Sequence, residues 1–138
     1  MRVRPWSIAA AALAVVAVFS GCAGTRPLKV ANPLEAEPER PLTDVPVPVG
    51  FIYRTKDSYI LKGNYRVARL VYVGSSAVDR VAAFYEEQMP LSRWKLKRDF
   101  GVTERVLTFE SEHEECSVRV QRRQGLTFLD VEIAPRRG

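Results

Sequence analysis

The chain has few cysteines and histidines, the residues that most often serve as nucleophile, base or metal ligand. Its 138 residues include two cysteines and one histidine, and its eight glycines are not gathered into a phosphate-binding loop. A nucleophilic serine or cysteine normally needs a nearby base, and a structural zinc ion normally takes four ligands. The sequence therefore contains no familiar catalytic or metal-binding motif, and we expect no cofactor.

A hydrophobic run long enough to span a membrane is also lacking. The uncharged apolar run Ile8–Phe19 has 12 residues, whereas a transmembrane helix needs about 20. The run follows the basic residues Arg2 and Arg4 and ends in Ser20 and Gly21. This order is typical of a secretory signal peptide. The alternative is a buried helix, but the run has no polar residues at helical spacing.

The last residue of this run and the three that follow it, Phe19-Ser20-Gly21-Cys22, resemble the lipobox of bacterial lipoproteins. In that family the cysteine becomes the first mature residue and carries the lipid. The resemblance covers residues 1–22, and Phe19 replaces the usual aliphatic residue. It implies cleavage between Gly21 and Cys22, lipidation of Cys22, and membrane attachment in the bacterial envelope. Two or three acyl chains together hold a protein firmly on a bilayer.

The anchor also affects how the second cysteine is interpreted. If Cys22 carries lipid, Cys116 is left as a free thiol, whereas a Cys22–Cys116 disulfide is the alternative in an oxidising compartment. Cys116 lies in an alternating strand pattern, so we expect it to be a small buried hydrophobic residue.

The charge balance is mildly basic. The net charge is +5, and removing Arg2 and Arg4 with the signal peptide leaves 19 basic against 16 acidic side chains. Such a balance suits weak attraction to an anionic membrane surface. It does not call for nucleic acid, and we expect no nucleic-acid partner.

The sequence divides into three parts: a signal peptide at 1–21, a lipidated cysteine with a tether at 22–48, and a globular domain at 49–138. Six of the nine prolines fall within 23–48, and proline disrupts both helices and sheets. The last part, Val45–Val49, is apolar enough to pack on the domain instead.

The domain pattern predicts an α+β fold with the order β-β-α-β-β-β-β. An antiparallel sheet of about five to six strands is expected, with one helix packed on one face. Ser76 fits the N-cap of this helix, and Asp79 three residues later completes an approximate capping box. The helix should bury one apolar stripe, formed by Val78, Val81, Ala82, Tyr85 and Met89. The expected strands are 58–62, 65–73, 94–100, 105–110, 116–121 and 126–134, and the expected helix is 77–89.

A second resemblance covers roughly residues 70–100. Tyr72-x-Gly74, Val81-x-x-Phe84-Tyr85-x-x-x-Met89 and Trp94 are similar to a pattern in small uncharacterised exported bacterial domains. This likeness implies a packing motif and no activity.

The segment Glu110–Cys116 holds the histidine, four acids and a cysteine. His113 and Cys116 are thus the candidates for a metal- or thiol-dependent enzyme. They lie at a predicted hairpin turn, where polar residues are usually solvated.

A basic sheet face is the other candidate site. Lys95, Lys97, Arg119 and Arg123 recur at alternating positions of two predicted strands, so a shared strand direction would gather them into one patch; an ordinary solvated surface is the alternative. The sequence thus favours a membrane-anchored envelope lipoprotein that serves as a binding or structural module. Its partner would be an envelope protein, lipid or glycan. If the cell is Gram-negative, Ala23 after the cysteine fits an outer-membrane lipoprotein that faces the periplasm.

Overall fold

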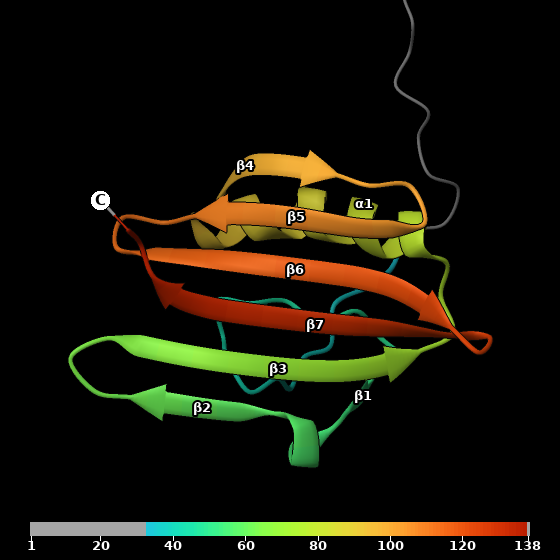
Figure 1. Cartoon of the computed structure of the whole chain (residues 1–138), viewed down its shortest axis with the longest axis horizontal. Coiled ribbons are helices and arrows are strands. Elements are labelled where there is room, and N and C mark those ends of the chain that lie inside the picture. The colour runs from blue at the N-terminus through green and yellow to red at the C-terminus, as the bar shows by residue number, and fades with distance from the viewer. Residues whose placement is uncertain (1–32, 138) are drawn as a thin grey trace, which may run out of the picture.

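The computed structural model describes residues 33–137, and these form an antiparallel sheet with one α-helix (Figure 1). The α+β class is confirmed. The helix is α1 (Val78–Gln88), and the strands are β1 (Ile52–Tyr53), β2 (Tyr59–Lys62), β3 (Arg66–Gly74), β4 (Lys95–Phe100), β5 (Glu104–Glu110), β6 (Glu114–Arg123) and β7 (Leu126–Pro135). Short 3-10 helices, η1 (Thr55–Asp57) and η2 (Met89–Ser92), precede β2 and β4.

The sheet has seven strands, one more than the upper limit expected. The spatial order is β1-β3-β7-β6-β5-β4, and β2 pairs with the same edge of β3 as β1 does. The additional strand is β1, which places three strands before the helix instead of two. Two residues are too few to show the alternation by which a strand is recognised in a sequence.

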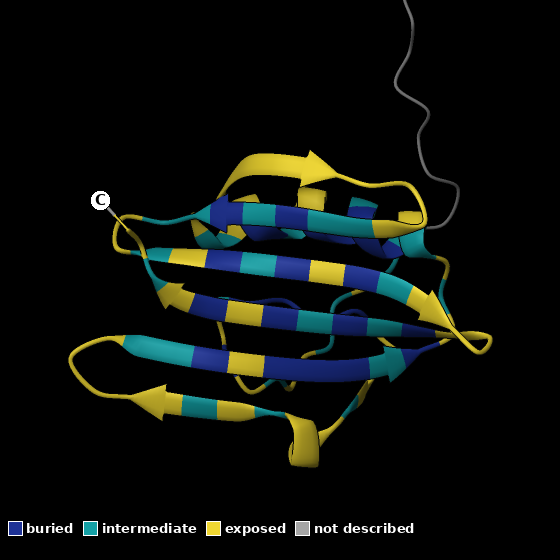
Figure 2. Cartoon of the chain, in the orientation of Figure 1, coloured by how far each residue is buried: buried dark blue, intermediate teal, exposed yellow. Residues whose placement is uncertain are grey.

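One face of the sheet is covered by two different parts of the chain. In Figure 1, α1 lies behind β5 and β6, while residues 33–51 pass behind β7 and β3. The helix buries the apolar stripe expected for it, including Val81, Ala82 and Tyr85. Along β6 and β7, buried residues alternate with exposed or partly buried ones (Figure 2), so the opposite face of the sheet is left open.

The segment before β1 belongs to the folded unit. Leu42, Val45 and Val47 are buried in the core, although they precede residue 49, where the sequence placed the start of the domain. Backbone hydrogen bonds close this segment on itself, from Glu37 N to Val47 O (2.7 Å) and from Val49 N to Glu35 O (2.8 Å). The core therefore uses apolar residues from between the prolines.

Candidate functional site: a cationic cleft at one end of the sheet

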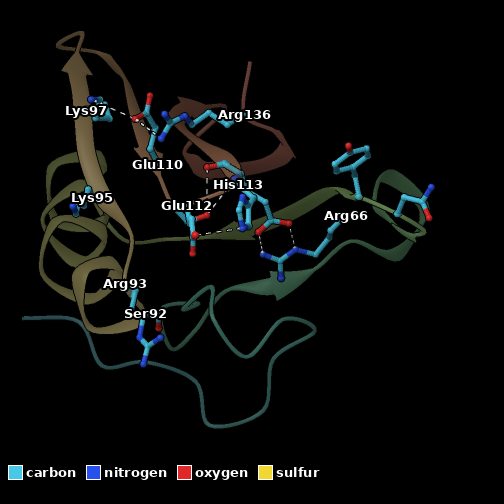
Figure 3. A pocket seen from close by; sticks show the side chains of 13 residues that line it. Arg66, Ser92, Arg93, Lys95, Lys97, Glu110, Glu112, His113 and Arg136 are labelled. Atoms are coloured by element: carbon cyan, nitrogen blue, oxygen red, sulfur yellow. Dashed lines mark hydrogen bonds and ion pairs between the residues drawn. The ribbon is translucent and has the colours of Figure 1, made fainter. Parts of the chain in front are cut away.

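An open cleft of about 830 Å³ lies where three connections meet at one end of the sheet. These are the β2–β3 connection, the segment from η2 into β4, and the β5–β6 turn, joined by the residue that follows β7. The lining residues are Asn64, Tyr65, Arg66, Ser92, Arg93, Lys95, Lys97, Glu110, Ser111, Glu112, His113, Glu114 and Arg136 (Figure 3). The cleft is thus assembled from residues far apart in the sequence.

Arg66 forms a fixed base of the cleft. Its guanidinium donates hydrogen bonds of 2.8 and 2.7 Å to the carboxylate of Asp44, and of 3.0 and 2.6 Å to that of Glu114. These bonds raise the pKa of Arg66 and, through Arg66, lower the pKa of Asp44 below its usual 3.8. Because paired forks of this kind are strong and directional, Arg66 is committed to the fold and has little capacity left for a ligand.

Glu110 is shared by two cations on the other side of the cleft (Figure 3). Its carboxylate lies 3.3 Å from Lys97 Nζ and 3.9 Å from Arg136 Nη1. Lys95 stands opposite Glu110 in the β4–β5 register, but its ammonium makes no ion pair with any of residues 33–137. The Glu110 carboxylate therefore balances two cations, and the charge of Lys95 has no partner among the described residues.

Arg93 occupies an unusual backbone position on the cleft wall. It ends η2 in the left-handed conformation, with φ at 66° and ψ at 18°, and its amide donates to the carbonyl of Pro90 (3.1 Å). This conformation is uncommon for residues other than glycine. Within the described part of the chain, the Arg93 guanidinium has no hydrogen-bond or ion-pair partner.

His113 and Cys116 do not come together. The imidazole of His113 is 80% exposed and lies 3.6 Å from Glu112, whereas Cys116 is buried in the core, in register with Phe109 and Ile133. Burial raises the pKa of the Cys116 thiol far above its usual 9.0, so the thiol stays protonated and unreactive. Residues 33–137 contain no cluster of three His, Cys, Asp or Glu side chains suited to a metal ion.

The four residues of the predicted basic face lie in two separate places. Strands β4 and β6 do run in the same direction, because both are antiparallel to β5. Lys95 and Lys97 nevertheless line the cleft, while Arg119 and Arg123 line a smaller groove of about 330 Å³ on the open face.

The arginines of this smaller groove have partners close at hand. Arg119 pairs with Glu104 (3.2 Å). Arg123 donates to Gln121 (2.8 Å), and its guanidinium carbon lies 5.9 Å from the centre of the Phe128 ring. The cleft, with Arg93 and Lys95 unpaired, therefore offers the more available positive charge.

Sequence reasoning did not single out Arg93 and Arg136 as site residues. Arg136 follows the last predicted strand, 126–134; its amide donates to the carbonyl of His113 (2.8 Å) and its side chain lines the cleft. Both arginines adjoin a strand end, where no periodic pattern marks them. The predicted sites Gly21 and Cys22 lie outside the described residues.

Between residues 33 and 137, no helix is long and apolar enough to cross a membrane. Comparison with protein-family models, curated proteins and solved structures finds no match to this chain.

Proposed function

We propose that the protein is a bacterial envelope lipoprotein, held on the membrane by lipid on Cys22, whose domain is a binding module. The observation that carries the binding role is the cleft, where Arg93 and Lys95 face solvent without a partner among the described residues. Concave sites with converging polar groups are the usual places for ligands. The membrane anchor is supported by the sequence of residues 1–22. In a Gram-negative cell the domain would face the periplasm from the outer membrane.

A thiol enzyme is disfavoured because Cys116 is buried in the core while the His113 side chain is exposed on the surface. A binding module needs no nucleophile, only a surface whose charge and shape complement a partner. The open cleft and its excess of cationic side chains fit that requirement.

The anchor is tested with Cys22→Ala in a bacterial host. We expect the variant to accumulate as an uncleaved precursor or to leave the lipid-modified fraction, and globomycin to have the same effect on the wild type. Membrane fractionation with a mass measurement of the N-terminal peptide reads both outcomes. A Cys22→Ala protein that is processed and retained like the wild type would refute the anchor.

The binding role is tested by crosslinking in intact cells. The double variant Arg93→Glu/Lys95→Glu reverses the two unpaired cations of the cleft. The matched control Lys56→Glu/Arg98→Glu reverses two exposed cations that line neither the cleft nor the groove. We expect crosslinked species to disappear in the first variant and to persist in the control. Equal crosslinking in both would remove the cleft from the binding surface.

A further inference from the structure

We propose that the cleft binds a phosphate group, held by Arg93, Lys95, Lys97 and Arg136. This inference rests on the proposed binding function and names the ligand chemistry. The phosphate could belong to a free phosphate monoester or to the phosphodiester of a phospholipid headgroup, and both present anionic phosphate oxygens. The inference depends on three observations: the charge balance of the cleft, the backbone of Arg93, and the position of Glu110.

The charge balance favours an anion. The lining holds three carboxylates and five cations, and the cations are Arg66, Arg93, Lys95, Lys97 and Arg136. Arg66 also pairs with Asp44, a fourth carboxylate that lies outside the lining. The cleft and its base together therefore carry a surplus of one positive charge, which suits the negative charge of a phosphate group at pH 7.

The backbone of Arg93 suggests that its side chain serves a purpose outside the fold. A left-handed residue other than glycine costs roughly 1–3 kcal/mol, and glycine would adopt φ 66° without that cost. The Arg93 side chain forms no hydrogen bond or ion pair with residues 33–137 that would offset this conformational free energy. A guanidinium held at a cleft wall is well suited to bind two phosphate oxygens at once.

Glu110 marks where an oxyanion fits. Its carboxylate already lies within ion-pair distance of both Lys97 and Arg136, and Lys95 is its cross-strand neighbour. A negatively charged oxygen is therefore tolerated among these three cations. A phosphate on the solvent side would share Lys97 and Arg136 with Glu110 and would lie beside the unpaired Lys95. Arg93 points away from this group, at the opposite end of the cleft (Figure 3), so its free side chain would turn toward the phosphate on binding.

The test uses the full chain, purified in an uncharged detergent, with amide chemical shifts followed by NMR. The soluble probes are inorganic phosphate and glycerol 3-phosphate. Vesicles of phosphatidylglycerol in phosphatidylcholine form the lipid arm, and vesicles carrying oleate provide a carboxylate of the same surface charge. We expect saturable shifts at cleft residues with the phosphate probes, and weaker effects with oleate.

The variant Arg93→Gly separates loss of binding from loss of folding. It removes the guanidinium, and glycine adopts the left-handed backbone conformation of this position without strain. We expect this variant to remain folded and to lose at least tenfold in phosphate affinity, whereas Lys56→Glu/Arg98→Glu stays within twofold of the wild type. Saturation by soluble probes would assign a free phosphate ester, and saturation by vesicles alone would assign a lipid headgroup.

Three results would overturn the phosphate assignment. They are the absence of saturable shifts with every phosphate probe, equal affinity of Arg93→Gly and the wild type, and equal binding of oleate and phosphatidylglycerol vesicles. If one of these occurs while crosslinking in cells still depends on Arg93 and Lys95, the binding function stands and the ligand has another chemistry. Loss of both signals rejects the two proposals together.

Discussion

Arg66 of β3 donates two hydrogen bonds, of 2.8 and 2.7 Å, to the two carboxylate oxygens of Asp44. Asp44 lies in the segment before β1, and its carbonyl accepts a further bond of 3.0 Å from the indole of Trp94. The pair thus ties this segment to the sheet directly below the cleft, and its removal should weaken both the fold and the cleft's base.

Replacing Asp44 with asparagine should lower the free energy of unfolding by about 1 kcal/mol at pH 7. Charge-assisted hydrogen bonds contribute more when buried, but this carboxylate is 35% exposed and partly screened. Urea denaturation measures the change. The matched control is Asp57→Asn, because Arg54 and Asp57 form a more exposed pair and should contribute a few tenths of a kcal/mol.

The contribution of Asp44 should also depend on pH. Arg66 lowers the pKa of Asp44 in the folded state below its usual 3.8, so the folded state binds fewer protons than the unfolded state as the pH falls past that value. The stabilisation is therefore present above pH 3.8 and is lost as the pH falls through the folded-state pKa. The difference between wild type and Asp44→Asn should shrink in acid, and a constant difference would argue against this ion pair.

Gly101, in the β4–β5 connection, should not tolerate alanine. Its φ is +99°, and an added Cβ would lie 1.8 Å from the carbonyl oxygen of Glu104. We expect Gly101→Ala to lower the free energy of unfolding by about 2–3 kcal/mol. Thermal denaturation should show Gly63→Ala unchanged, because Gly63 is in a turn with open space around it. Equal stability of the two variants would contradict this geometry.

Local patterns predicted the helix and every strand except β1, but not how the ends of these elements are arranged. The helix stripe was correct because its period directly reflects burial. Ser76, however, does not cap the helix: the N-cap is Ala77, and the Ser76 carbonyl instead accepts a hydrogen bond from the buried Thr127 hydroxyl (2.6 Å). A partner 51 residues away is not visible in a local pattern.

Strand β4 shows a second limit. Its alternation predicts a half-buried strand, yet all six of its residues are exposed. The strand lies at the sheet edge, and a bulge between Leu96 and Arg98 shifts its register. A bulge breaks the two-residue period on which the prediction depends. The sequence identified Lys95 and Lys97 as candidate site residues. It did not show that they lie apart from Arg119, because that separation depends on the pairing register: Lys95 pairs with Glu110 at one end of β5, whereas Arg119 pairs with Val106 near the other end.

Cys116 should react with thiol reagents only when the chain unfolds. The side chain is buried and its pKa is raised by burial, and the thiolate is the reactive form. In the Cys22→Ala background, where Cys116 is the only thiol, maleimide labelling should be slow in buffer and complete in urea. Rapid labelling of the folded protein would restore the thiol-enzyme interpretation.

Replacing Glu110 with glutamine should strengthen phosphate binding. The substitution keeps the shape of the side chain and removes the negative charge that Lys97 and Arg136 now share, so the surplus of the cleft and its base rises from one positive charge to two. Each added charge contributes more to affinity at low salt, because salt screens exposed charges beyond about 10 Å at 0.1 M. We expect affinity for glycerol 3-phosphate to rise several-fold at low salt and the gain to fall as salt is added.

Two controls make the Glu110 result specific. Glu104→Gln removes a carboxylate of the same strand that pairs with Arg119 at the smaller groove, so it should leave phosphate affinity unchanged. Glu110→Gln combined with Arg93→Gly should bind less tightly than Glu110→Gln alone, because Arg93 acts on the ligand and not through Glu110. If Glu110→Gln weakens binding, Glu110 positions Lys97 and Arg136 for the ligand instead of competing with it.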